Sequence, residues 1–233
     1  MRLDRRARLP VPEGLDRGQV EVWLFEPSPE RAARLAGTLA PDELERRERL
    51  SGNARARFTD VRGCLRAILA GHLGVAPRDV PIAYGPHGRP VLADGQADEL
   101  AFSVSHSAAL AAIAVAAGRG VGVDVQARRP RARVELLANA ILAPGERDRF
   151  RRLPRAALQA AFIDLWCVKE ACSKLVGRGL TLPLRTIAVD DPTGPLTAAT
   201  VGDDGPRCVV RRLPTGAGYG GALAVADDSA RVP

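Results

Sequence analysis

The sequence predicts an α+β fold built from two similar halves, each a helix packed on a small, mainly antiparallel sheet. Two long helical patterns support this prediction, because the run FTDV at 58–61 of the first matches FIDL at 162–165 of the second. In both places short β-type runs with glycine-containing turns follow the helix. We therefore expect an N-terminal half over residues 1–118 and a C-terminal half over 119–233, related by a pseudo-twofold axis. Ligands often bind in a cleft between such halves.

The N-terminal half begins with an arginine-rich tail and a predicted strand over Gln19–Phe25, followed by proline-bounded polar helices over Pro29–Arg49. The main helix is predicted over Asn53–Leu73, because apolar residues recur there at helical spacing. A turn is expected at Tyr84–Pro90. We expect an antiparallel meander from three short β-type runs, over Leu100–Ser105, Ala109–Ala116 and Val121–Gln126.

The C-terminal half is dominated by helical patterns, of which the clearest covers Arg155–Val176. Gly177 and Gly179 follow it as natural C-terminal caps. Two shorter helices are expected over Val134–Leu142 and Gly145–Leu153. The chain is expected to close with strands near Arg185–Val189, Cys208–Leu213 and Gly221–Ala226.

The composition restricts the class of protein. A net charge of +7 and a pI near 10 imply anionic partners, which include nucleic acid, phosphorylated metabolites, acidic proteins and membrane surfaces. The longest apolar run, 100–117, contains three serines and a histidine, so it predicts buried strands and no membrane span. No apolar stretch follows the basic start, so we expect a cytoplasmic protein. The four cysteines lack zinc-site spacing and are expected to be buried thiols.

The run GVGVDVQ, residues 120–126, offers the first candidate site. Strand alternation turns Asp124 and Gln126 to the same face, with their oxygen donors about 7 Å apart. Such donors can hold a hard cation between them or through water, which is how magnesium is usually bound. An ordinary solvent-facing strand is the alternative interpretation.

The second candidate site is the run WCVKEACSKLVGRGL, residues 166–180. Trp166, Glu170 and Lys174 follow one another at i,i+4 spacing and line one helix face. Lys169 and Lys174 are the only lysines among 34 basic residues, and a compact ammonium suits a site beside a phosphate better than a planar guanidinium does. Chance placement of two lysines, and an ordinary surface ion pair of Glu170 with Lys174, are the alternatives.

Weaker candidates lie upstream in the chain. His106 ends the run FSVSHS, whose serines supply hydroxyl donors for phosphate oxygens or simply form a turn. The arginines from Arg46 to Arg66, and Arg89 in the run HGRP, are either a phosphate clamp or a solvated face.

Together these stretches resemble the phosphopantetheinyl transferases of the larger monomeric kind, the group typified by the surfactin synthetase activator. The signature of that family is a Val/Ile-Gly-Val/Ile-Asp strand followed further along by Trp-x-x-Lys-Glu-Ala/Ser-x-x-Lys. Here the two parts read GVGVDVQ and WCVKEACSK, and YGPHGRP and FSVSHS lie upstream in the family's order. The likeness spans most of the chain.

The resemblance implies transfer of the 4'-phosphopantetheine arm of coenzyme A to a serine of an apo acyl or peptidyl carrier protein, with release of adenosine 3',5'-bisphosphate. It implies Mg²⁺ held by Asp124 and Glu170, with Gln126 as a weak or water-mediated ligand where well-known members carry a third acidic residue. Glu170, or a water that it orients, would take the serine proton, and Lys174 would contact phosphate. The cofactor-binding residues implied by motif position are Arg57, Arg89, Ser105, His106, Lys169 and Lys174, and more loosely Arg46 and Arg47.

The resemblance also implies a monomer without nucleic-acid or membrane partners. Because carrier proteins are generally acidic, we expect the arginine-rich stretch Arg128–Arg133 to meet the carrier protein. Two alternatives stay open. A basic nucleic-acid binder fits the charge, but only 4% of residues are aromatic and no recognised binding motif is present. The second is a non-catalytic carrier-protein binder of the same fold, and the intact Asp124, Lys169, Glu170 and Lys174 count against it.

Overall fold

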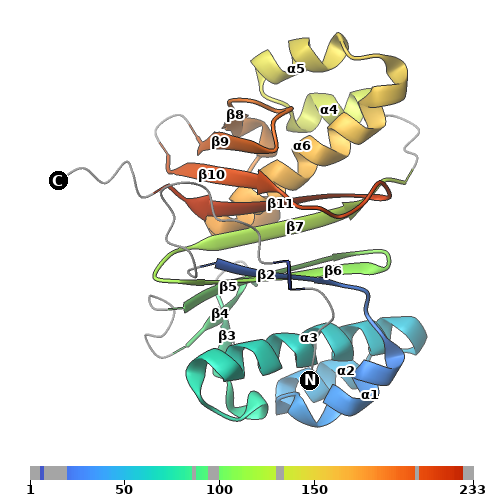
Figure 1. Cartoon of the computed structure of the whole chain (residues 1–233), viewed down its shortest axis with the longest axis vertical. Helices are drawn as coiled ribbons and strands as arrows, with labels where there is room; N and C mark the ends of the chain where they lie inside the picture. Colours follow the sequence, from blue (N-terminus) through green and yellow to red (C-terminus); the bar gives the residue numbers. More distant parts are fainter. Residues whose placement is uncertain are drawn as a thin grey trace, which may run out of the picture.

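The computed structural model describes residues 6–7, 20–85, 88–93, 100–129, 134–202 and 205–227. These ranges form four layers, with helices outside and two antiparallel sheets between them (Figure 1). The predicted α+β class is confirmed, whereas the boundary between residues 118 and 119 stays a prediction. Within the described ranges, no helix is both long enough and apolar enough to span a bilayer.

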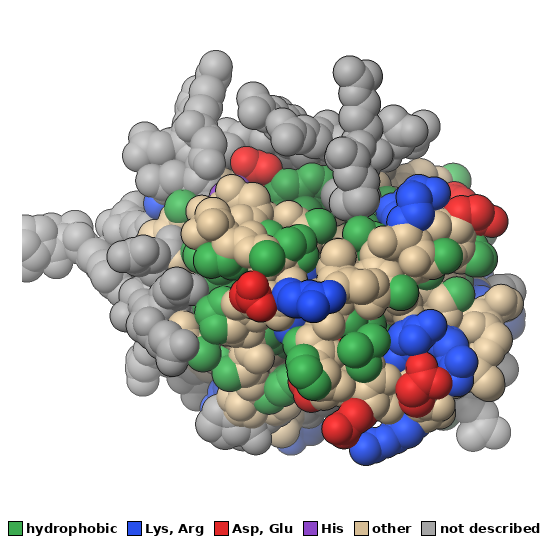
Figure 2. Space-filling model, turned by 90° about the horizontal axis from the view of Figure 1, so that it is seen from below, with side chains coloured by type: hydrophobic (Ala, Val, Ile, Leu, Met, Phe, Trp, Pro, Cys, Tyr) green, Lys and Arg blue, Asp and Glu red, His purple; other side chains and the backbone are tan. Residues whose placement is uncertain are grey.

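The N-terminal half packs three helices on a sheet of order β1-β2-β6-β5. The helices are α1 (Pro29–Leu35), α2 (Pro41–Glu48) and α3 (Gly52–Leu73), with 3-10 turns η1 (Ala36–Thr38) and η2 (Pro77–Asp79). The strands are β1 (Arg6–Ala7), β2 (Val20–Phe25), β5 (Leu100–Ser107) and β6 (Leu110–Ala117). The turn predicted at Tyr84–Pro90 connects a separate hairpin of β3 (Ile82–Tyr84) and β4 (Pro90–Leu92). Basic and acidic side chains are interspersed on the helical face of this half (Figure 2).

The C-terminal half has a sheet of order β7-β11-β10-β9-β8, and α6 lies across it (Figure 1). Its strands are β7 (Val121–Ala127), β8 (Ile187–Val189), β9 (Leu196–Val201), β10 (Arg207–Arg212) and β11 (Tyr219–Ala226). Its helices are α4 (Val134–Ile141), α5 (Pro144–Arg151) and α6 (Arg155–Leu175), with 3-10 turns η3 (Gly179–Thr181) and η4 (Leu184–Thr186).

The predicted meander of three strands is wrong at its last strand. β5 and β6 pair as expected, but β7 pairs with β11 in the second sheet. The side chains of Val121, Val123 and Val125 lie between the two sheets, against alanines of β6. Sequence reasoning also missed β9, because its run LTAATV has too little contrast between apolar and polar residues to show a strand period.

The edge strands β5 and β7 of the two sheets lie side by side, and serine hydroxyls of β5 connect them. Alternate backbone N–H groups of β7 donate to the three serines of β5, which occupy alternate positions of that strand. The three bonds are Val123 to Ser103 at 3.0 Å, Val125 to Ser105 at 3.2 Å and Ala127 to Ser107 at 3.0 Å. These side chains satisfy N–H groups that a neighbouring strand would otherwise bind, so they fix the register between the halves.

Each half contains the same buried ion pair between a short helix and its main helix. Glu43 pairs with Arg66, and Glu146 pairs with Lys169 at 2.8 Å, with the same separation of 23 residues. Both glutamates also accept the N-cap backbone N–H of their helix after a Leu-Ala-Pro run. This repeated arrangement supports a common architecture for the halves, in which the main helices correspond at an offset of 103 residues (169 − 66). The expected match of FTDV with FIDL, at an offset of 104 (162 − 58), is therefore out of register by one residue.

The Lys169–Glu146 pair generates a stability prediction. Lys169→Met should lower the free energy of unfolding by about 3–5 kcal/mol, because it leaves a buried carboxylate unpaired. The double variant Glu146→Gln/Lys169→Met should recover much of this loss, because it removes both charges. Urea denaturation checks both values. A single variant as stable as the wild type would contradict a structural role for Lys169.

Candidate active site

The candidate active site lies where the C-terminal part of α6 crosses β7. Gly122 makes this crossing possible, since a Cβ atom there would lie 2.0 Å from the carbonyl oxygen of Ala171. The helix therefore packs directly on the strand backbone. This contact brings Glu170 and Lys174 of α6 beside Asp124 of β7.

Asp124 is buried and held by both halves of the molecule. Its Oδ1 accepts hydrogen bonds from the Ser105 hydroxyl and the Lys174 ammonium, each at 2.8 Å. The Ser105 hydroxyl also accepts the N–H of Val125, so both of its bonds serve the protein. Ser105 was expected to bind the cofactor, but the structure assigns its hydroxyl to Asp124 and β7.

The buried carboxylate of Glu170, unlike that of Asp124, is not fully hydrogen-bonded. It is only 5% exposed, and its buried Oε1 has no hydrogen-bond partner among the described residues. Burial and the neighbouring Asp124 raise the pKa of Glu170, while Lys174 opposes the rise. A buried carboxylate oxygen without a partner is costly, and a divalent cation shared with Asp124 would remove that cost. Asp124 and Glu170 therefore fit a magnesium site.

Gln126 supports Asp124 in this geometry. Its Nε2 donates to Asp124 Oδ2 at 3.3 Å, and its Oε1 accepts from the Ser107 hydroxyl at 3.4 Å. The amide has this orientation because a carboxylate can only accept. Its oxygen therefore faces Ser107. In this arrangement Gln126 does not present an oxygen to a metal, which differs from its expected role as a weak ligand. The described residues contain no group of three or more His, Cys, Asp or Glu side chains able to hold a metal.

Cationic side chains from both halves border the carboxylates. Partial burial, Arg57 of α3 and Lys174 of α6 all lower the pKa of His106 on β5. His106 thus lies within electrostatic reach of two cations from different halves. The two cations attract an anion to this site, and a bound phosphate would raise the pKa of the imidazole.

Lys169 is not part of this site, which corrects the expected cofactor contact. Its side chain is fully buried, and Nζ donates to Glu146 and to the carbonyls of Leu184 and Ile187. Lys169 and Glu170 are neighbours on a helix, so they point in different directions. Lys169 therefore fastens α6 to α5 and the start of β8.

The remaining residues that were expected to bind the cofactor or the carrier protein make contacts within the protein. On α2, Arg46 lies over the ring of Phe58, 5.2 Å from its centroid, and Arg47 pairs with Glu48 at 2.9 Å. Their role in cofactor binding stays a prediction. In the expected docking stretch, Arg128 is bound to Asp164 at 2.6 Å and to the Tyr219 carbonyl. Residues 130–133 of that stretch lie outside the described ranges.

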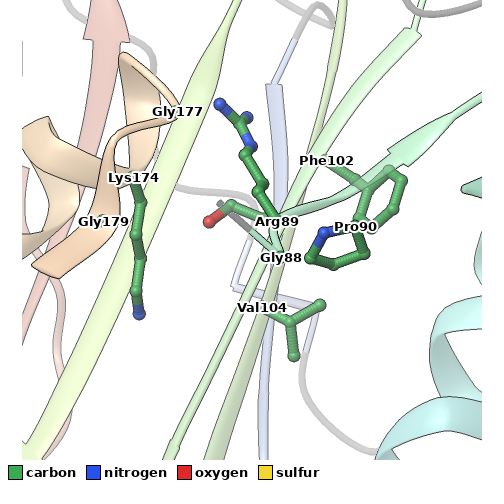
Figure 3. A pocket seen from close by; sticks show the side chains of 9 residues that line it. Gly88, Arg89, Pro90, Phe102, Val104, Lys174, Gly177 and Gly179 are labelled. Carbon is green, nitrogen blue, oxygen red and sulfur yellow. The ribbon is translucent and has the colours of Figure 1, made fainter. Parts of the chain in front are cut away.

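Arg89 borders a pocket of about 180 Å³ between the two halves (Figure 3). Lys174 lies on one side of this pocket, and Pro90, Phe102 and Val104 lie on the other. The guanidinium of Arg89 is bound to backbone carbonyls of α6 and β7. Sequence reasoning missed this contact, because no local pattern shows which carbonyls a distant arginine will reach.

The site combines two buried carboxylates with a lysine and nearby cationic side chains. This set of groups is typical of enzymes that act on phosphorylated substrates. The family model of the 4'-phosphopantetheinyl transferase superfamily matches residues 120–224. The 4'-phosphopantetheinyl transferase HetI of Nostoc sp. is 40% identical over 178 residues, which cover 74% of this chain and 75% of HetI. This chain therefore belongs to the 4'-phosphopantetheinyl transferase superfamily.

The matches confirm the transferase activity expected from the sequence, phosphopantetheinyl transfer to a carrier protein. The finer assignment to the surfactin synthetase activator type stays a prediction. A solved holo-(acyl-carrier-protein) synthase from Bacillus anthracis, in complex with CoA (3',5'-ADP), matches with a TM-score of 0.36 and 23% identity. That match covers 46% of this chain and 94% of the synthase, and a likeness this low supports no argument here.

The arrangement around Gln126 generates a prediction about metal binding. Gln126→Glu should lower the melting temperature in chelator, because a third carboxylate would replace the amide donor beside Asp124. It should also shift the magnesium midpoint, read from the melting temperature, to lower concentration. Gln126→Met, of similar size and without polar groups, is the control and should show no such shift. An unchanged midpoint in Gln126→Glu would show that this side chain does not face the metal.

Proposed function

We propose that this protein transfers the 4'-phosphopantetheine arm of coenzyme A to a serine of an acidic apo carrier protein in a magnesium-dependent reaction, acting as a monomer. Adenosine 3',5'-bisphosphate is the second product. The observation that carries the proposal is the buried pair of Asp124 and Glu170, with the Lys174 ammonium bonded to Asp124. Membership of the superfamily and the 40% identity to HetI support the same reaction.

Asp124 and Glu170 are the residues that would hold Mg²⁺. When bound, the ion supplies neutralisation of charge on the pyrophosphate. The protein contributes a rigid carboxylate at Asp124, whose Oδ1 accepts from Ser105 and Lys174 and whose Oδ2 accepts the longer bond from the Gln126 amide at 3.3 Å. It also contributes the partly exposed ammonium of Lys174, which is placed to contact a substrate phosphate.

Glu170 is the base that this site offers for the carrier serine. Burial and Asp124 raise the pKa of Glu170 in the metal-free protein, which favours proton acceptance, while a bound Mg²⁺ would oppose that rise. The serine oxygen forms a bond to the phosphorus of phosphopantetheine, and the bond from that phosphorus to the bridging pyrophosphate oxygen breaks. The serine proton passes to Glu170, directly or through a water. The leaving group is adenosine 3',5'-bisphosphate.

Arg57 and His106 provide the anion-binding side of the cleft. They come from the N-terminal half, and His106 lies within electrostatic reach of both Arg57 and, from the C-terminal half, Lys174. Arginine binds phosphate in a bidentate way, so Arg57 suits the ribose 3'-phosphate, while His106 and Lys174 suit the pyrophosphate. Coenzyme A would thus be bound by both halves.

A direct assay tests the proposal. The protein is incubated with coenzyme A, magnesium and several apo carrier proteins, and mass spectrometry measures the addition of one phosphopantetheine arm. Asp124→Asn and Glu170→Gln should each lower kcat by at least about a hundredfold, because each removes charge where the reaction requires it. Glu45→Gln, an exposed change on α2, is the matched control and should keep full activity.

Three outcomes of this assay would contradict the proposal. Binding of coenzyme A without any mass increase would favour a non-catalytic carrier binder. No increase with any carrier, together with tight and salt-sensitive DNA binding, would favour the nucleic-acid alternative. Full activity of both carboxylate variants would place the reaction elsewhere.

His106 generates a prediction about pH. Its pKa in the free protein lies below the ordinary value, and a neighbouring phosphate would raise it. Binding of coenzyme A without metal should therefore take up protons near pH 6.5, and affinity should increase as the pH falls. Calorimetry in buffers of different ionisation enthalpy measures this uptake. His106→Gln should lose part of it, and equal uptake by the variant and the wild type would exclude a contact of His106 with phosphate.

A further inference from the structure

Arg89 belongs to the N-terminal half, but its guanidinium binds two backbone carbonyls of the C-terminal half. Nη1 donates to the carbonyl of Leu175 at 3.0 Å, and Nη2 donates to that of Val121 at 3.2 Å. Leu175 is the last residue of α6, and Val121 is the first residue of β7. Arg89 therefore connects the ends of the two elements that carry the active-site residues.

This bridge lies next to the ion pair of the active site. Leu175 directly follows Lys174, and Val121 precedes Asp124 on the same strand. Gly122 packs against α6 between these two contacts. The Arg89 bridge and the Lys174–Asp124 bond are thus neighbouring connections between α6 and β7. A change in the distance between α6 and β7 at the bridge would therefore also change the distance between Lys174 and Asp124.

The end of α6 explains why a guanidinium is suited to this position. The last carbonyls of a helix lack intrahelical partners and carry a partial negative charge. Backbone N–H groups of residues 176–178 reach the carbonyls of Cys172, Lys174 and Ser173, and Arg89 binds that of Leu175. A planar guanidinium can donate to two separate acceptors, whereas an ammonium is a compact point charge that holds their spacing less well.

We propose that Arg89 is a positioning residue for the transfer reaction, holding Lys174 and Glu170 in register with Asp124 through the end of α6. This inference rests on the proposed function. It differs from the expectation that Arg89 binds the phosphates or adenine of coenzyme A, because here both of its terminal nitrogens already donate to protein carbonyls. Since Arg89 also borders the pocket shown in Figure 3, a group bound there would contact the same side chain.

Kinetics and hydrogen exchange of Arg89→Lys test the proposal. The variant should lose about tenfold to a hundredfold in kcat, because small displacements of reacting groups are costly. Its KM for coenzyme A should stay within about twofold of the wild type. Amide exchange should accelerate in the last turn of α6. Arg78→Lys is the matched control, because the exposed Arg78 side chain donates to the Gly37 carbonyl within the N-terminal half.

Two results would overturn the inference. One is an unchanged kcat, and the other is a large rise in KM for coenzyme A with unchanged exchange, which would make Arg89 a direct ligand. If the wild type modifies no carrier, the proposed function fails, but the exchange comparison still tests the bridge. If Arg89→Lys does not fold, Arg89→Gln, which can reach only one carbonyl, is measured in the same way.

Discussion

The bonds between the serines of β5 and the backbone of β7 are the interaction on which the rest of the structure depends. They fix the register between two sheets that share no backbone ladder. Ser105 then uses its hydrogen atom to hold Asp124. Once β7 is fixed, Gly122 lets α6 approach, and Lys174 completes the bonds to Asp124. The site is thus a consequence of how the halves are joined.

The molecule contains two kinds of buried carboxylate. Glu43 and Glu146 are paired with cations and with N-cap amides, so their charges are compensated within the protein. Glu43 Oε1 lacks a hydrogen bond, but it lies 3.6 Å from Arg62 Nε. Glu170 is buried to a similar degree, with an oxygen that has no hydrogen-bond partner and with no ion pair among the described residues. A buried charge without a partner lowers the stability of the fold, and such charges are found where a ligand or a reaction uses them. This contrast separates structural from functional acids more clearly than sequence position does.

The similarity of the halves shows which residues are specialised. The Leu-Ala-Pro run, the capping glutamate and the cation on the main helix occur in both halves and serve the fold. At the register set by these pairs, the positions of Glu170 and Lys174 correspond to Ala67 and Gly71 in the N-terminal half. Glu170 and Lys174 therefore have no counterpart of the same type in the N-terminal half, whose His106 lies within electrostatic reach of Arg57 and Lys174.

The sequence alone determined the features that follow from local periodicity. The strand alternation around Asp124 and the helical spacing of Glu170 and Lys174 are set by backbone geometry, so the main elements and the faces that carry these side chains were predictable. The pairing of Asp124 with Glu170 was implied by the resemblance to the transferase family. Only the tertiary structure decided which of two nearby lysines enters the site, that β7 leaves the first sheet, and that Ser105, Gln126 and Arg89 act on protein groups. The physical reason is that a side chain's partner depends on which distant segment packs against it, and no local period records that contact.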